Sequence, residues 1–165
     1  MKRIFAVVLM FVVFLCACSE KKEIKPKIKN ISFVAKITYY NEKYSLNTIF
    51  DSEGNMKASV LEPDDYKDLS FEFKDNKVTA EYLGLTYTPQ KGNLAVNNVA
   101  GIIYSAFNDT AKISELTVKN GENCKTEGEI EGKKYILSFS PAGLPLSLEL
   151  PKDGYKAEFN ELTLR

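Results

Sequence analysis

Apolar and polar residues alternate along much of this chain, and this period of two is the feature that most limits its possible folds. It is clearest in LSFEFKD (69–75), VTAEYL (78–83), KYILSFS (134–140) and LPLSLEL (144–150). Successive side chains of a strand point to opposite faces, so the pattern indicates strands with one buried and one solvated face. Such strands are typical of antiparallel sheets, and the chain is predicted to be mainly β.

Short polar sequences of the kind found in tight turns separate the alternating runs. Glu53-Gly54-Asn55 and Lys152-Asp153-Gly154 are two examples, and their residue types favour close chain reversals. In the last run the apolar phase slips after Phe159, which predicts a β-bulge near Asn160. We expect strands near 31–41, 43–52, 55–62, 69–75, 77–83, 85–88, 113–119, 124–131, 133–140, 144–150 and 155–164.

One segment, LAVNNVAGIIYSAFND, follows a helical period instead. Its apolar residues recur three or four positions apart, which predicts an amphipathic helix of about three turns. We expect this helix near Leu94 to Phe107, with Asn93 as a candidate N-cap. Its apolar stripe comprises Val96, Val99, Ile103, Ala106 and Phe107.

A sheet of about ten strands curls rather than staying flat, and the apolar stripe of the helix needs a surface to cover. The predicted fold is therefore an incomplete antiparallel β-barrel, a strongly curved sheet of about ten strands. The one amphipathic helix is expected to cover its concave apolar face.

The start of the chain has the composition of a secretory signal. Lys2 and Arg3 precede an uncharged apolar run, Ile4 to Cys18, after which the sequence turns abruptly polar. The run is shorter than the about 20 apolar residues that a membrane-spanning helix needs. A basic start, a short apolar core and a small residue before the cut are typical of a signal peptide.

The end of that run, Leu15-Cys16-Ala17-Cys18, resembles the bacterial lipobox. The resemblance implies cleavage between Ala17 and Cys18, and a diacylglyceryl group on the sulfur of Cys18. Two acyl chains hold a protein stably to a bilayer, so we expect an extracytoplasmic protein anchored to the cell membrane by lipid. The alternative is an ordinary signal peptide, residues 1–17, followed by an incidental cysteine.

Residues 18–30 are predicted to be the lipidated cysteine and a lysine-rich tether, and residues 31–165 one folded domain of ordinary size. The tether holds five lysines, and twelve flexible residues span on the order of 20 Å. Its lysines either touch anionic head groups or form a solvated spacer. They are Lys21, Lys22, Lys25, Lys27 and Lys29.

Several functional classes are disfavoured by the residue types present. Lys plus Arg and Asp plus Glu both number 22, without the basic excess of nucleic-acid binders. The chain has no histidine, the usual general base and a common metal ligand. Cys124 stands alone in the mature chain, which excludes an internal disulfide. We expect no enzyme activity and no cofactor.

Three acidic residues, Glu127, Glu129 and Glu131, alternate along one predicted strand. As a metal site they would need further oxygen ligands converging from elsewhere. The simpler interpretation is the solvated face of a strand, so no metal site is expected.

Two longer stretches resemble a family of bacterial lipoproteins. LEPDDYKDLSFEFKDNKVTAEYLGLTYTP (61–89) has a Pro-led turn, a hairpin and then Tyr-x-Gly-Leu-x-Tyr, and GLPLSLELPKDGYKAEFNEL (143–162) is similar to that family's closing hairpin. The family is of Gram-positive type and belongs with the LolA/LolB-like and LppX-like lipoprotein domains. The resemblance implies an incomplete antiparallel barrel with helices over an apolar hollow, and it transfers no functional residue.

The first functional hypothesis is a membrane-anchored binder of an acyl chain, a lipid or another apolar ligand. The alternative is an envelope protein-interaction or sensory module without a small ligand. A continuous hollow of several hundred Å³ favours the ligand, whereas a filled core with an exposed apolar patch favours a protein partner. The candidate ligand-lining residues are Phe71, Phe73, Val99, Ile103, Phe107, Leu146 and Leu148.

Overall fold

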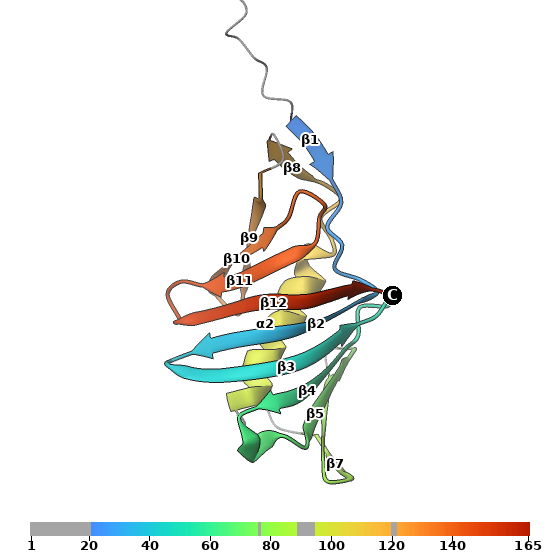
Figure 1. Ribbon diagram of the computed structural model, residues 1–165, viewed down its shortest axis with the longest axis vertical. Coiled ribbons are helices and arrows are strands. Elements are labelled where there is room, and N and C mark those ends of the chain that lie inside the picture. Colours follow the sequence, from blue (N-terminus) through green and yellow to red (C-terminus); the bar gives the residue numbers. More distant parts are fainter. Residues whose placement is uncertain (1–20, 76, 89–94, 120–121) are drawn as a thin grey trace, which may run out of the picture.

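The computed structural model describes residues 21–75, 77–88, 95–119 and 122–165. They form a strongly curved antiparallel sheet with one helix, α2 (Ala95–Thr110), on its concave side (Figure 1). The ten strands lie in the order β7-β6-β5-β4-β3-β2-β12-β11-β10-β9, so the sheet is open, with β7 and β9 at its edges. The predicted fold class is confirmed.

The strand bounds follow the sequence periodicity closely. The described strands of the large sheet are β2 (Ile31–Tyr39), β3 (Glu42–Phe50), β4 (Met56–Glu62), β5 (Leu69–Lys74), β6 (Lys77–Tyr82), β7 (Leu85–Tyr87), β9 (Cys124–Ile130), β10 (Lys133–Phe139), β11 (Pro145–Leu150) and β12 (Tyr155–Leu164). A short 3-10 helix, η1 (Asp64–Tyr66), joins β4 to β5. The pairing of β12 with β2 shifts between Asn160 and Thr163, which confirms the predicted bulge.

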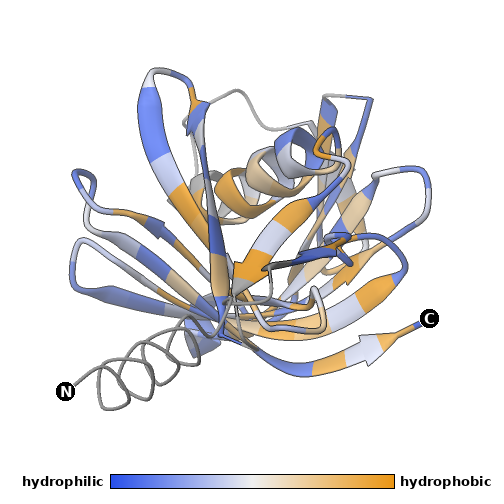
Figure 2. Cartoon of the chain, turned by 90° about the horizontal axis from the view of Figure 1, so that it is seen from above, coloured by the Kyte–Doolittle hydropathy of each residue, from blue (hydrophilic) through white to orange (hydrophobic). Residues whose placement is uncertain are grey.

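The hydrophobic core lies between the sheet and α2. Figure 2 looks along the molecule and shows the helix inside the curve of the sheet. At the centre, the ring of Phe33 lies 5.6 Å from that of Phe107 and 4.9 Å from that of Phe159, measured between centroids. The ring of Phe50 adds a further contact, 5.4 Å from Phe107. Buried aromatic side chains contribute large apolar areas, so this cluster holds the helix to the sheet.

Buried tyrosines fasten the helix at two more points. The Tyr155 hydroxyl donates to the backbone oxygen of Val99 at 3.0 Å. The Tyr135 hydroxyl donates to Asp109 at 2.9 Å and lies 3.2 Å from the Thr110 hydroxyl. Burial, together with Asp109, raises the pKa of Tyr135 to about 12 although Thr110 opposes the shift, so the phenol stays neutral.

Gly128 is the residue of β9 that faces Tyr135 on β10. A Cβ at this position would lie 2.4 Å from the Tyr135 hydroxyl oxygen. The Tyr135 ring therefore lies over the Gly128 backbone. Through its hydrogen bond to Asp109, it holds the end of α2 near the β9 edge of the sheet.

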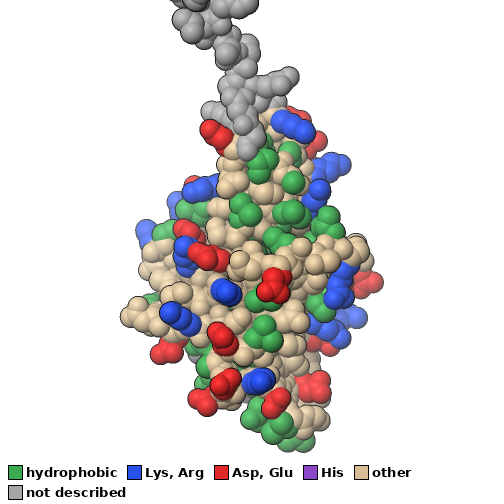
Figure 3. Space-filling view, in the orientation of Figure 1, with side chains coloured by type: hydrophobic (Ala, Val, Ile, Leu, Met, Phe, Trp, Pro, Cys, Tyr) green, Lys and Arg blue, Asp and Glu red, His purple; other side chains and the backbone are tan. Residues whose placement is uncertain are grey.

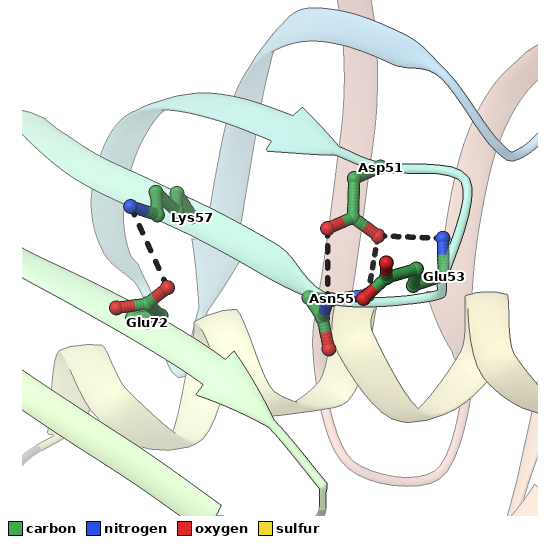
Figure 4. Close-up of polar contacts among 5 residues, drawn as sticks. All are labelled: Asp51, Glu53, Asn55, Lys57 and Glu72. Atoms are coloured by element: carbon green, nitrogen blue, oxygen red, sulfur yellow. Dashed lines mark hydrogen bonds and ion pairs between the residues drawn. The ribbon is translucent and has the colours of Figure 1, made fainter.

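The turn between β3 and β4 is held by Asp51 (Figure 4). Its carboxylate accepts hydrogen bonds from the backbone N–H groups of Glu53 and Asn55, and from the Asn55 side chain, all at 2.9 Å. Partial burial alone would raise the pKa of Asp51, but these hydrogen bonds lower it. Asn108 of the helix donates to the oxygen of Gly54 at 3.1 Å, so the turn is tied to α2.

The N-terminal segment differs from the sequence prediction. Within residues 18–30, predicted to be a flexible tether, Lys21–Ile24 forms strand β1 and pairs with β8 (Leu116–Lys119) in a small second sheet. Ile28 is buried, and the Lys27 N–H donates to the oxygen of Gly143 at 2.8 Å. The tether prediction is therefore wrong for residues 21–30, which belong to the folded domain.

None of the helices in the described ranges is long and apolar enough to cross a membrane. The apolar run Ile4 to Cys18 and the candidate cap Asn93 lie outside the described residues.

Candidate functional site

Six of the seven predicted ligand-lining residues are buried in the helix–sheet interface. Phe71 and Phe73 lie on the inner face of β5, Leu148 lies on β11, and the helix contributes its stripe. The stripe residues Val99, Ile103 and Phe107 are fully buried. The structure thus brings together residues that are far apart in the sequence.

These side chains pack against one another instead of lining a hollow in the described part of the chain. The ring of Phe73 stacks on Tyr104 of the helix at 5.2 Å between centroids. The same ring lies 3.7 Å from where a Cβ would stand on Gly101. That distance is an ordinary van der Waals contact, so the helix and β5 pack together without a gap at this point.

Leu146, the seventh residue, is only half-buried. Ser147 pairs with Ser138, but Phe139 pairs with Pro145, so Leu146 is an extra residue in β11. This bulge shifts the alternation, and Pro145 takes the buried position that the sequence pattern gave to leucine.

One polar atom in the filled interface has no partner. The Thr48 hydroxyl of β3 is fully buried and makes no hydrogen bond in the described structure. Thr48 stands opposite Phe33 on β2 and Ala58 on β4, both buried. An unpaired buried hydroxyl is unfavourable, and among the described residues Thr48 alone carries one.

Among the hollows on the described surface are two that lie away from the stripe of α2. One, of about 240 Å³, lies over β2, β3 and β12 and is lined mainly by charged residues, including Lys36, Lys43, Glu62, Lys156 and Glu158. The other, of about 200 Å³, lies between residues 26–29 and the end of the helix, and it is lined also by Ile113 and Leu164. The first is mainly charged and the second is open to solvent, unlike the enclosed apolar cavity typical of a lipid site.

The β6–β7 hairpin carries an exposed apolar surface, called here the apolar edge strip: Tyr82, Leu83, Leu85 and Tyr87. These side chains are 41%, 68%, 73% and 42% exposed. Figure 3 shows hydrophobic side chains gathered at the lower tip of the molecule, where Figure 1 places β7. The strip therefore lies at the end of the molecule opposite β1 and β8.

The pairing register explains why the strip is apolar. Tyr82 stands opposite Leu85 and also opposite the buried Leu69, while Tyr87 stands opposite the buried Ala80. Residues that face each other across antiparallel strands share one face of the sheet. Tyr82, Leu85 and Tyr87 therefore continue the inner, core-facing surface of the sheet, and Leu83 extends the strip at the turn.

Leu83 occupies an unusual backbone position at the tip of this hairpin. Leu83 and Gly84 have φ values of 49° and 77°, as in the type I′ turn that joins two-residue hairpins. Asn, Asp and Gly are preferred at such positions, and a leucine there is uncommon. The strained and exposed leucine adds a second reason to regard the strip as a binding surface.

The other chemistry-bearing residues form no site in the structure. Glu127 and Glu129 are exposed on β9, and Glu131 lies in the following turn. No group of three or more His, Cys, Asp or Glu side chains in the described ranges is arranged to hold a metal. Burial raises the pKa of the Cys124 thiol, which disfavours its reactive form. Ala17 and Cys18 lie outside the described residues.

No protein-family model matches the sequence, and no curated protein matches it. Among the solved structures similar to this fold is the crystal structure of LolA superfamily protein NE2245 from Nitrosomonas europaea, with 10% sequence identity and a TM-score of 0.43. The similarity covers 86% of this chain and 89% of that one. A likeness of this size establishes neither family membership nor a ligand.

Proposed function

We propose that this chain is a lipid-anchored, extracytoplasmic binding module without enzymatic activity. The anchor is a diacylglyceryl group on Cys18, made after removal of the signal peptide, residues 1–17. The basic start, the apolar run and Leu15-Cys16-Ala17-Cys18 support this part of the proposal. The lack of histidine supports a binding role over catalysis.

The binding surface that the geometry favours is the apolar edge strip, and its occupant is an apolar segment of an envelope protein. One observation carries this choice. The interface beneath α2 is filled, whereas four large apolar side chains stand exposed together at the open β7 edge. Exposed apolar patches of this kind mark protein-interaction sites.

The proposal is tested by placing a photo-crosslinking amino acid at Leu85 in living cells. A matched probe at Tyr40, 64% exposed on the turn after β2, serves as the control. We expect a discrete crosslinked species from position 85 and none from position 40. If this crosslinked species disappears when Leu83→Ser and Tyr87→Ser are also introduced, the contact is assigned to the strip. Identical products from both positions would contradict a specific surface.

The second candidate is an apolar ligand beneath the helix, such as an acyl chain. The unpaired hydroxyl of Thr48 favours an apolar ligand that also carries a polar group, such as a fatty acid, because its carboxyl group would supply the missing hydrogen-bond partner. Native mass spectrometry of protein from its own host would detect a co-purified lipid.

A fluorescent fatty acid distinguishes the two candidates. If α2 is a movable lid, wild type binds the probe, and Ile103→Asp stays folded but loses it. If α2 is a fixed core element, wild type binds no probe and Ile103→Asp unfolds, because an unpaired charge in a dry interface costs several kcal/mol. The filled interface leads us to expect the second result.

A further inference from the structure

The segment from Lys22 to Lys29, called here the lysine strap, places its lysines on the outside of the folded domain. Burial alternates along it: Lys25, Lys27 and Lys29 are exposed, whereas Pro26 is half-buried and Ile28 is buried. The apolar residues face the domain, so the three lysines point outward together.

The backbone of the strap is fixed to the β10–β11 turn. The Lys27 N–H donates to Gly143, and a Cβ on Gly143 would lie 2.3 Å from the backbone oxygen of Lys25. Gly143 has a φ of 80°, in the left-handed region that glycine adopts easily. The strap and the turn are therefore in direct contact, and the lysines sit on an ordered scaffold.

The strap has a local excess of positive charge in a chain that is neutral as a whole. From Lys22 to Asn30 four lysines stand against one acid, Glu23, with Glu115 nearby. None of the four pairs with an acid in the described part of the chain, whereas Lys57, Lys112, Lys133 and Lys156 each do. The strap lysines remain available for an external anion.

The strap also lies next to the proposed anchor. Cys18 precedes Lys21 by three residues, and an extended chain spans at most about 3.6 Å per residue, so roughly 11 Å separates them at most. β1, which begins at Lys21, lies at the end of the molecule opposite β7 (Figure 1). A lipid on Cys18 would hold that end at the bilayer surface.

We propose that the lysine strap binds the anionic head groups of the membrane that holds the anchor, so that the domain rests on the bilayer with its apolar edge strip directed away. This inference rests on the proposed lipidation of Cys18. Lysines near an anionic surface are attracted to it, and a lipid with a basic patch forms a two-part membrane signal.

The test uses the mature lipoprotein, purified in detergent and reconstituted into phosphatidylcholine vesicles with or without phosphatidylglycerol. A water-soluble acetylating reagent labels exposed lysines, and mass spectrometry reads each position. We expect phosphatidylglycerol to slow labelling of Lys22, Lys25, Lys27 and Lys29, by roughly fivefold at each lysine that contacts the surface. Lys67 and Lys77, which lie outside the strap, serve as internal controls, and high salt should abolish the protection.

Two charge-reversal variants, one in the strap and one outside it, test whether the protection depends on the strap lysines. Lys25→Glu with Lys27→Glu and Lys29→Glu should remove the protection at Lys22, whereas Lys67→Glu with Lys74→Glu and Lys77→Glu should leave it intact. All six side chains are exposed, so both variants should fold. Equal labelling in the two vesicle types, with lipid present on the N-terminal peptide, would overturn the strap proposal alone. An N-terminal peptide without lipid would overturn the anchor and the strap proposal with it.

Discussion

The two edges of the sheet, β9 and β7, are built in opposite ways. β9 presents the exposed charges Lys125, Glu127 and Glu129, and the end of α2 is fixed beside it through Tyr135 of the neighbouring β10. β7 has no charged residue, and all three of its residues are exposed, including Leu85 and Tyr87. Free sheet edges pair with other chains unless charge, proline or a covering element prevents it. Charge and the nearby helix therefore protect the β9 edge from pairing with another chain, whereas the β7 edge is accessible to a partner.

The reach of the helix explains the difference. α2 ends beside β9 and β10, where Asp109 meets Tyr135, and it reaches β5 through Tyr104 and Phe73. The inner face of β6 and β7 continues the apolar pattern of β5 past that contact. We therefore expect substitutions at the covered side to change mainly stability and substitutions at the open side to change mainly binding.

The largest difference in stability is expected between Phe107, on the buried side of α2, and Tyr87, in the apolar edge strip. Phe107→Ala should lower the free energy of unfolding by about 3–5 kcal/mol, because it leaves a cavity in a filled interface. Tyr87→Ala should change it by about 1 kcal/mol or less, since Tyr87 is 42% exposed. Urea denaturation measures both. Similar losses would mean that the strip is part of the core.

The second-largest difference in stability is expected between substitutions of two glycines, one near each edge of the sheet. Gly128→Ala on β9 forces Cβ into the Tyr135 ring and should destabilise the fold by about 1–3 kcal/mol. Gly84→Ala at the β6–β7 turn has nothing within 4 Å, so the change should be about 1 kcal/mol from its backbone conformation alone. Thermal unfolding of the two variants compares them directly. A milder effect at Gly128 would show that Tyr135 moves aside.

A substitution of Leu83 is expected to have opposite effects on stability and on binding. Leu83→Asn puts a residue that tolerates positive φ into the type I′ turn, and it should stabilise the fold by about 0.5–1 kcal/mol. The same change should weaken the crosslink from position 85, because it removes an exposed apolar side chain. Denaturation and crosslinking are measured on the same preparations. A variant that gains stability and keeps full crosslinking would remove Leu83 from the binding surface.

The smallest effect concerns the Asp51 turn, which ties α2 to the sheet between the two edges. The folded-state pKa of Asp51 lies below the ordinary value of 3.8. A lowered pKa stabilises the fold above the unfolded value, and that contribution is lost as the pH falls through the folded value. Wild type should therefore lose part of its stability below about pH 4, and Asp51→Asn should lose less over that interval. Parallel pH profiles would assign the acid sensitivity to other carboxylates.

The sequence by itself determined the strands, the helix and most of the buried face. A period of two or of about 3.6 is a local property, so it can be read without knowing the neighbours. The slip after Phe159 revealed the bulge in β12 for the same reason. The alternation predicts the wrong face for Leu146, because its bulge depends on how β11 aligns with β10. The sequence of one strand does not contain that alignment.

The tertiary structure alone decided what each face meets. Periodicity predicted that Ile103 and Phe107 face the sheet, but whether a hollow separates them depends on how Gly101, Tyr104 and Phe73 fit together. The apolar edge strip has the same alternation as a buried strand, yet its side chains are exposed in the folded domain. The sequence predicts a tether for the lysine strap, because its two isoleucines form too weak a pattern to show that β8 and the β10–β11 turn contact it. Local patterns fix which side chains share a face, and only long-range packing determines whether that face meets a helix, a cavity or water.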